Sequence, residues 1–194
     1  MIKNKMAAII LAGGKSTRME EDKALLKISG LRLIEKIIRD IEPYFQEIII
    51  STSPETIHRY SFLPLRIAAD KESHQGPLRG LLTGLQASQY PVNFVMACDI
   101  PEIHIPFLQI MMTFAGEYDI VVPVTGENKF EPLFAFYHCR VIPKIQELLK
   151  QGIKQVLKLF PLCRVKYIPM VDQSWFYNLN TMGDYEKYIK EKNC

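Results

Sequence analysis

Short apolar runs alternate with longer amphipathic segments along most of this chain. Runs with the length and β-branched content of buried strands occur at 6–11, 47–51, 65–69, 93–97, 118–124 and, as an extended segment near the sheet edge, 166–170. Helical spacing or helix-start signals occur at 31–41, 55–60, 77–85, 106–115, 141–150, 154–160 and 183–190. Strands that alternate with helices are joined by right-handed crossovers and form mostly parallel sheets. The pattern therefore predicts a Rossmann-like, three-layer α/β/α fold with its active site at the carboxyl ends of the strands.

Composition adds a size and a compartment to this picture. The 194 residues are 48% hydrophobic and 23% charged, which is typical of a globular protein, and they predict a single domain over residues 1–194. A net charge of +3 is too small to indicate nucleic-acid binding, and no apolar run approaches the roughly 20 residues that span a bilayer. The N-terminal lysines and apolar run resemble a signal peptide only faintly, because cleavage after the run would destroy the loop described next. We expect a cytoplasmic protein without membrane or nucleic-acid partners.

Cysteine and histidine give no sign of a metal or disulfide framework. Cys98, Cys139, Cys163 and Cys194 are far apart and form no C-x-x-C pair, and the four histidines are equally scattered. Free thiols in a reducing compartment are therefore expected in preference to disulfides or a zinc site.

A glycine-rich basic loop follows the first predicted strand. Gly13 and Gly14 let the backbone turn sharply and approach a ligand closely. Lys15, Arg18 and Lys23 add three cations within the next nine residues. Backbone N–H groups ringed by cations form a binding site for a polyphosphate.

Two familiar phosphate-binding loops are excluded by spacing. The tripeptide 14–16 resembles the end of a Walker A loop, but the first glycine of that motif would fall at Ile9, inside the strand. The dinucleotide fingerprint G-x-G-x-x-G is absent because Gly13 and Gly14 are adjacent. The loop is of another kind.

Three glycines recur at four-residue spacing in the segment that opens with Gly76-Pro77. A proline suits the first turn of a helix, and Gly76, Gly80 and Gly84 would share one face of that helix. Each glycine weakens a helix by about 1 kcal/mol relative to alanine, so the bare face needs a reason. We expect Gly84 to pack closely on the sheet, and Gly76 and Gly80 to lie against a flat ligand.

Asp99 directly follows the buried strand at 93–97. A carboxylate at the end of a central strand could hold Mg²⁺ against a triphosphate, or it could cap the next helix. With the phosphate loop upstream, the magnesium site is the favoured interpretation.

The last two polar candidates lie in the C-terminal half. Glu131 precedes a proline, which holds it extended, while Phe134, Phe136 and Tyr137 are expected to pack in the core or the sheet. The 178–181 segment precedes the last predicted helix, so Asn178, Asn180 and Thr181 could cap this helix. The resemblance described next supplies the alternative, in which they face a ligand.

The motifs together resemble a known enzyme family. The string L-A-G-G-x-S-x-R-M-x-x-D-K at 11–23 resembles the signature loop of nucleotidyltransferases that activate small phosphorylated molecules. Motifs at 70–84 (G-P-L-x-G), 97–101, 131–137 (E-P-L) and 178–181 (N-L-N-T) occur in family order and narrow the resemblance to molybdenum cofactor guanylyltransferases. The chain departs from the family pattern at Glu20, Ser53, Arg79 and Met182, where the family usually has glycine, a nearby asparagine, alanine or glycine, and proline.

The resemblance implies roles for individual residues. The turn Leu11-Ala12-Gly13, with Gly14, Lys15 and Lys23, would bind the triphosphate of GTP, and Arg18 would help to neutralise it. Asp70 would contact the nucleotide, Gly76 and Gly80 would seat guanine, and Asp99 would hold Mg²⁺. Residues Asn178, Asn180, Thr181 and Glu131 would face the pterin.

The implied reaction transfers GMP from GTP to molybdenum-molybdopterin and releases pyrophosphate. No Ser–His or Cys–His nucleophile is evident, and none is needed, because such transfers rest on positioning and charge neutralisation. Two alternatives stay open: a related nucleotidyltransferase, using CTP or another phosphorylated acceptor, and a non-catalytic nucleotide-binding adaptor in cofactor delivery. Transient contacts with other molybdenum cofactor proteins would fit either role.

Overall fold

The structure is a computed structural model that describes residues 4–12, 23–28, 30–70, 76–127 and 129–192. The predicted phosphate-loop residues Gly13, Gly14, Lys15 and Arg18, together with Glu20, lie outside the described residues.

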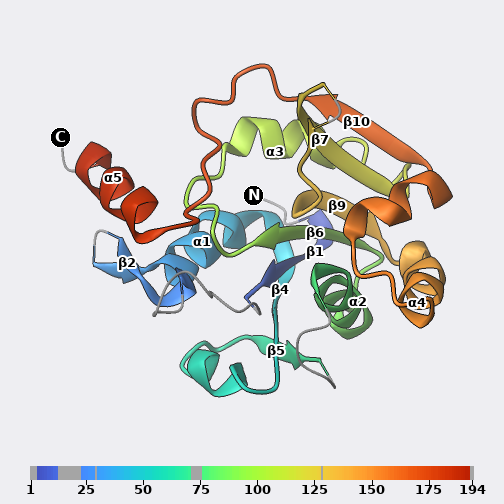
Figure 1. The fold of residues 1–194 in the computed structure, drawn as a ribbon, viewed down its shortest axis with the longest axis horizontal. Helices are drawn as coiled ribbons and strands as arrows, with labels where there is room; N and C mark the ends of the chain where they lie inside the picture. The colour runs from blue at the N-terminus through green and yellow to red at the C-terminus, as the bar shows by residue number, and fades with distance from the viewer. Residues whose placement is uncertain (1–3, 13–22, 29, 71–75, 128, 193–194) are drawn as a thin grey trace.

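One eight-stranded sheet forms the centre of the fold (Figure 1). Its strands run in the spatial order β10-β7-β9-β6-β1-β4-β5, with β8 paired to β7. Strand β1 pairs in parallel with β4 and β6, β4 pairs in parallel with β5, and β7 pairs in parallel with β10. Strand β9 is antiparallel to both β6 and β7, and β8 is antiparallel to β7. Their bounds are β1 Asn4–Leu11, β4 Phe45–Thr52, β5 Arg66–Ala69, β6 Val92–Ala97, β7 Ile120–Gly126, β8 Lys129–Phe130, β9 Phe134–His138 and β10 Val165–Pro169.

Helices cover both faces of this sheet, as the three-layer prediction requires. One face packs against α1 (Leu33–Ile41), α3 (Ile105–Met112) and α5 (Met182–Lys192). The other packs against α2 (Pro77–Ala87) and α4 (Ile142–Lys150). Short 3₁₀ turns lie at η1 Lys23–Leu25, η2 Glu42–Tyr44, η3 Ile57–Tyr60, η4 Cys139–Val141 and η5 Val156–Leu162.

Alternation along the strands divides the core in two. Ile10 and Phe94 point into the α1/α3 layer, whereas their neighbours Ile9 and Val95 point into the α2/α4 layer. Among the aromatic residues predicted to be in the core, Phe134, Phe136 and Tyr137 are all buried. The central strands are thus apolar on both faces, so their polar chemistry is confined to their ends.

Several predicted boundaries are wrong by a few residues. The helix predicted over 31–41 begins at Leu33, because Leu31–Arg32 (β3) pairs with Lys27–Ile28 (β2) in a small hairpin. The segment predicted as a helix from 154 is the 3₁₀ turn η5, which contains Pro161. Pro161 removes a backbone donor, which disfavours a regular α-helix there.

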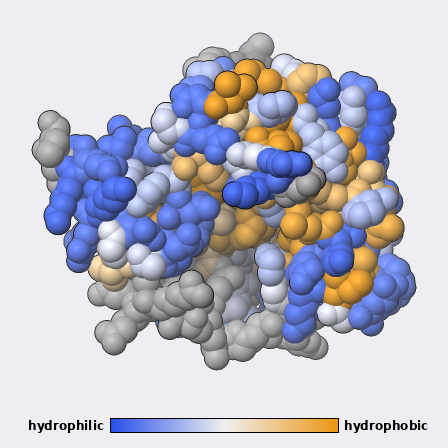
Figure 2. Space-filling model, turned by 45° about the horizontal axis from the view of Figure 1, so that its top comes forward, coloured by the Kyte–Doolittle hydropathy of each residue, from blue (hydrophilic) through white to orange (hydrophobic). Residues whose placement is uncertain are grey.

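The last helix differs from the others in its surface. Only Tyr188 of α5 is buried, and the α5 lobe at the left of Figure 2 is predominantly hydrophilic. Within the described part of the chain, no helix has the length and apolar character that crossing a membrane would require.

Candidate active site

The carboxyl ends of four parallel strands meet at one edge of the sheet. Strands β5, β4, β1 and β6 are consecutive neighbours, and hydrogen bonds continue beyond their last residues. Ala12 N–H donates to Ser51 O (2.8 Å), and Cys98 N–H donates to Leu11 O (3.2 Å). Asp70 N–H likewise donates to Thr52 O (3.1 Å). The residues that follow β1, β5 and β6 are therefore held in register at this edge.

Side-chain hydroxyls fix the chain where it leaves β1 and β4. The carbonyl of Ala12 accepts from Tyr60 Oη (3.0 Å) and Thr52 Oγ1 (3.3 Å), so the main chain is held in place at Ala12, directly after β1. Thr56 Oγ1 lies 2.7 Å from Thr52 Oγ1 and 2.9 Å from Ser53 Oγ. Ser53, where the resembling family has an asparagine nearby, thus takes part in the turn after β4.

Lys23 and Asp99 form an ion pair at this edge. Lys23 Nζ lies 3.8 Å from Asp99 Oδ2, and the two side chains are 16% and 25% exposed. Burial raises the pKa of Asp99, whereas Lys23 and a backbone hydrogen bond oppose that rise. Asp99 does not cap α3, because His104 occupies the N-cap and its Nδ1 accepts from Phe107 N–H (3.3 Å). The capping alternative for Asp99 is therefore wrong, and its carboxylate is left for other chemistry.

Glu131 lies within electrostatic reach of Asp99. Burial raises the pKa of Glu131, the Thr125 hydroxyl opposes the rise by donating to Oε1 (3.3 Å), and the charge of Asp99 raises the pKa further. The main chain supports this arrangement, since Ala97 N–H donates to Leu133 O (2.9 Å). Two carboxyl groups far apart in sequence are therefore close enough for the charge of one to influence the other.

The C-terminal segment is attached to the same place. Leu179 N–H donates to the carbonyl of Asp99 (2.8 Å). Next to it, Asn178 Oδ1 is buried and accepts no hydrogen bond in the described structure. A buried amide oxygen without a donor is costly, so this atom is a candidate ligand contact.

The start of α5 is built by a reciprocal cap. The Asp184 carboxylate accepts from Asn180 N–H (3.0 Å) and Thr181 N–H (2.8 Å), and Thr181 Oγ1 accepts from Asp184 N–H (3.2 Å). Hydrogen bonds from Thr181 and Asn180 lower the pKa of Asp184, and the positive charge of Lys23 adds to this shift. For Thr181, the capping interpretation fits the geometry.

The three spaced glycines have three different environments. A Cβ on Gly84 would lie 2.4 Å from Ile9 Cγ2, so close packing on β1 is confirmed there. A Cβ on Gly80 would meet Leu11 and Ser51 only at 3.7 Å, an ordinary contact. Gly76 precedes the helix as its N-cap, with φ +79°, and faces Lys154. The expectation that Gly76 shares the helix face of the other two is wrong, because the left-handed backbone there turns it away.

Asp70 has partners that the sequence did not reveal. The Thr83 hydroxyl of α2 donates to Asp70 Oδ1. Burial raises the pKa of Asp70, while this hydrogen bond and the charge of Arg79 lower it. The only sequence signal for Thr83 was its position four residues after Arg79, on the same face of the predicted helix.

The described residues suit a magnesium ion bound partly by substrate. Within the described ranges, no three His, Cys, Asp or Glu residues cluster as a protein-only metal site. Mg²⁺ is commonly held by one or two carboxylates plus phosphate oxygens and water. Asp99, partly buried and with one long ion pair, fits that role, and Glu131 is a second carboxylate within electrostatic reach.

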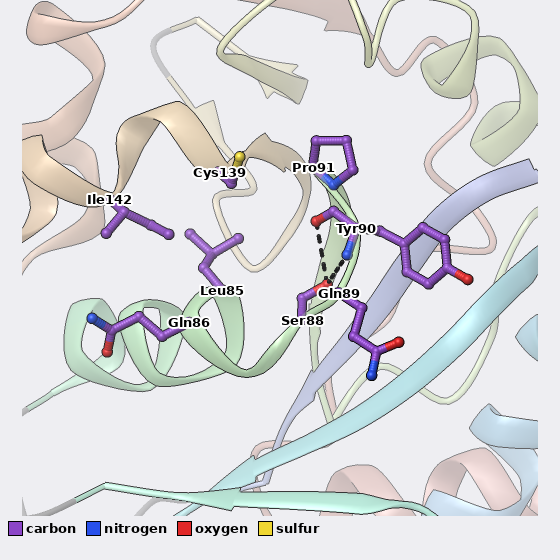
Figure 3. Close-up of a pocket in the computed structure, with 8 residues that line it drawn as sticks. All are labelled: Leu85, Gln86, Ser88, Gln89, Tyr90, Pro91, Cys139 and Ile142. Carbon is purple, nitrogen blue, oxygen red and sulfur yellow. Dashed lines mark hydrogen bonds between the residues drawn. The ribbon is translucent and has the colours of Figure 1, made fainter.

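A separate cavity of about 620 Å³ lies away from this site (Figure 3). Its walls come from the end of α2, the connection to β6, and the chain after β9. They include Leu85, Tyr90, Cys139 and Ile142. This is the amino end of β6, opposite to Asp99, and none of the predicted site residues lines it.

Comparison with solved structures first defines the class of fold. The chain resembles molybdopterin-guanine dinucleotide biosynthesis protein A from Archaeoglobus fulgidus with a TM-score of 0.81 at 20% identity, covering 96% of this chain and 98% of that one. It also resembles 2-C-methyl-D-erythritol 4-phosphate cytidylyltransferase from Thermus thermophilus, with a TM-score of 0.73 at 12% identity over 97% and 98% of the chains. The fold is that of nucleotidyltransferases.

Sequence comparison then gives the family. Residues 8–166 match the MobA-like NTP transferase domain. Proteins named probable molybdenum cofactor guanylyltransferase are 33% identical in Bacillus cereus (strain G9842) and 34% identical in Bacillus mycoides (strain KBAB4), each over 97% of this chain and 98% of theirs. The chain belongs to the MobA-like NTP transferase family and is a nucleotidyltransferase. This finding favours an enzyme over the adaptor considered above.

Proposed function

We propose that this protein transfers GMP from GTP to the phosphate of molybdenum-molybdopterin and releases pyrophosphate. The names of the Bacillus relatives support the substrate pair. The observation that carries the proposal is the Lys23–Asp99 pair, placed at the carboxyl edge of the sheet with the 178–181 segment bonded to the Asp99 main chain. The nucleotide site and the acceptor site would then both include Asp99.

Lys23 neutralises the triphosphate in this proposal. Its side chain is only 16% exposed and its ammonium group lies beside Asp99, so the charge is held at the strand-end site. A preorganised cation in a poorly solvated site stabilises negative charge that grows on the leaving pyrophosphate. Leu11, Ala12, Gly13, Gly14, Lys15 and Arg18 would complete the phosphate-binding loop.

Asp99 is the proposed ligand of Mg²⁺. When bound, the ion would supply charge neutralisation and polarisation at the α-phosphate. The protein's own part is to keep this carboxylate partly shielded from water, oriented by its backbone contacts and free of the α3 cap. Because burial raises its pKa, a bound cation would favour the charged form.

The acceptor would enter between Glu131 and the C-terminal segment. Asn178 offers a buried carbonyl oxygen without a donor, and Glu131 lies within electrostatic reach of Asp99. Asn180 and Thr181 are held by Asp184, which orders the main chain before α5. Holding the acceptor phosphate in line with the leaving group is the main catalytic requirement of such a transfer.

The test is a turnover assay with the full chain, Mg²⁺, molybdenum-molybdopterin and one nucleoside triphosphate at a time. We expect pyrophosphate release and a dinucleotide product with GTP. Product with CTP in preference to GTP would identify a cytidylyltransferase instead, and no product with any nucleotide would contradict the proposal.

A further inference from the structure

A cation occupies the first turn of α2, where the resembling family has alanine or glycine. Arg79 is the third residue of α2 and precedes Gly80, the glycine proposed to seat guanine. Its main-chain N–H donates to Gly76 O (3.2 Å), which fixes its place in the turn. The following inference rests on the proposed function, because it concerns how the same site recognises its base.

Among the described residues, the guanidinium of Arg79 has no acceptor at Nε and no carboxylate in an ion pair. Its Nε is buried and has no hydrogen-bond acceptor, and no carboxylate among the described residues lies within 4.0 Å of its nitrogens. A buried donor without an acceptor is unfavourable, and a ligand that supplies one would relieve this.

Asp70 lies beside Arg79 at the end of β5. Thr83, four residues after Arg79 on the same helix, donates to Asp70 Oδ1, so Asp70 faces the side of α2 that carries Arg79. The positive charge of Arg79 reaches Asp70 and lowers its pKa against the effect of burial. The two groups are therefore neighbours of opposite charge that form no direct ion pair.

This arrangement complements one edge of guanine. Guanine presents the O6 acceptor next to the N1–H donor, whereas a guanidinium only donates and an ionised carboxylate only accepts. We propose that Arg79 donates to O6 of the guanine base, beside a carboxylate of Asp70 held in place by Thr83, and that Arg79 thereby determines base specificity. Gly80, the next residue, adds no side chain beside Arg79, and a Cβ there would touch Leu11 and Ser51 at 3.7 Å.

Nucleotide analogues separate this role from a contact with phosphate. ITP keeps O6 and N1–H of guanine but lacks the 2-amino group. The triphosphate of 2-aminopurine riboside keeps the amino group but lacks O6 and N1–H. All carry the same triphosphate, so only a base contact distinguishes them.

The experiment measures dissociation constants of GTP, ITP, 2-aminopurine riboside triphosphate and CTP, with Mg²⁺, for the full chain and three variants. Arg79→Ala should raise the dissociation constants of GTP and ITP by about tenfold, which is the size expected for the loss of one hydrogen bond from a charged donor. The dissociation constant of the 2-aminopurine analogue should rise by less than about twofold. Arg79→Lys keeps the positive charge but lacks the planar set of N–H donors of a guanidinium, so its loss of GTP affinity should be intermediate. Arg39→Ala, which removes an exposed cation from α1, is the control and should change none of the constants.

Three results would overturn the inference. If Arg79→Ala raised the dissociation constants of all four nucleotides equally, the arginine would contact the phosphates and not the base. Unchanged GTP binding in Arg79→Ala, with a normal wild type, would show that the arginine has no role in binding. A wild type that binds no GTP would overturn the proposed function, and the inference with it. Thermal melts of each variant accompany the measurement, so that a loss of fold is not mistaken for a loss of contact.

Discussion

Two aspartates at opposite ends of the sheet show how a carboxylate built for structure differs from one available to a ligand. Asp119 precedes β7 and accepts from Arg140 Nε, Lys144 Nζ (3.4 Å) and Arg164 N–H (3.0 Å). Although burial opposes the shift, these partners lower the pKa of Asp119 to about 2. Asp99, at the carboxyl edge, has one ion pair at 3.8 Å, and burial raises its pKa.

The two carboxylates differ in how far protein partners compensate their charge, and much less in how exposed they are. The side chain of Asp119 is 13% exposed and that of Asp99 is 25% exposed, so neither is freely hydrated. Asp119 has its charge compensated by the protein itself. Asp99 has much less compensation, which is the state expected of a group that a cation or substrate will complete.

The largest expected effect is on catalysis, from Lys23→Ala. Removing the one cation that faces Asp99 in the described part of the site should lower kcat/KM by about 10²–10³-fold, because charge on the pyrophosphate loses its neutralisation. Pyrophosphate release measures this. Lys5→Ala, at an exposed position of β1, is the matched control and should be fully active; equal losses in both variants would show that the assay reports general charge and not this site.

The second effect is on stability, from Asp119→Asn. The folded pKa of Asp119 is about 2, below its ordinary 3.8, so its stabilisation is present above pH 4 and is lost as the pH falls from about 4 to 2. Because the Arg140 and Lys144 side chains are 43% and 37% exposed, solvent screens these ion pairs, and the stabilisation at neutral pH is about 1 kcal/mol. Urea unfolding at pH 7 should show a loss of about this size in the variant, with a weaker acid dependence than the wild type. Unchanged stability would contradict the structural role, and a selective loss of turnover would place Asp119 in the active site.

A smaller effect separates two glycines of α2. Gly84→Ala should destabilise the fold by about 1–3 kcal/mol, because its Cβ would clash with Ile9. Gly80→Ala has room for the methyl group and should leave stability unchanged or raise it by up to about 1 kcal/mol through helix propensity. Thermal melts and GTP titrations on both variants check this. A lower GTP affinity of Gly80→Ala without loss of stability would support the proposal that guanine lies against Gly80, and an unchanged affinity would contradict it.

The smallest expected effect concerns the acceptor. Asn178→Ala removes a buried amide whose oxygen has no donor, so stability should change by less than about 1 kcal/mol. If the amide binds the pterin substrate, its KM should rise severalfold while the KM for GTP stays constant. An equal rise in both would instead indicate that the 178–181 segment positions Asp99.

Much of the architecture was predictable because hydrophobic pattern and strand ends are local properties. Buried runs ending near Leu11 and Ala97 placed β1 and β6, and parallel neighbours then had to bring Ala12 and Asp99 to one edge. The antiparallel β9 was not predicted as a strand. Its residues had been expected in the core or the sheet, but its pairing with β6 and β7 depends on contacts far apart in the chain.

The parts of the site that depend on three-dimensional neighbours were less accessible. Sequence placed Asp70 at a strand end but not Thr83 beside it, because that hydrogen bond depends on how α2 lies over β5. Spacing put Gly76 on a helix face, whereas its positive φ places it before the helix. The assignments of Gly13, Gly14, Lys15 and Arg18 stay predictions.

The most direct test of the account is calorimetric binding of GTP in the presence of Mg²⁺ to the wild type, Asp99→Asn and Asp119→Asn. If Asp99 is the uncompensated carboxylate that completes a metal–triphosphate site, Asp99→Asn should lose most of its affinity for GTP and most of the dependence on Mg²⁺, with an unchanged melting temperature. Asp119→Asn should bind GTP as the wild type does and should melt earlier. Full Mg²⁺-dependent GTP binding in Asp99→Asn would contradict the account.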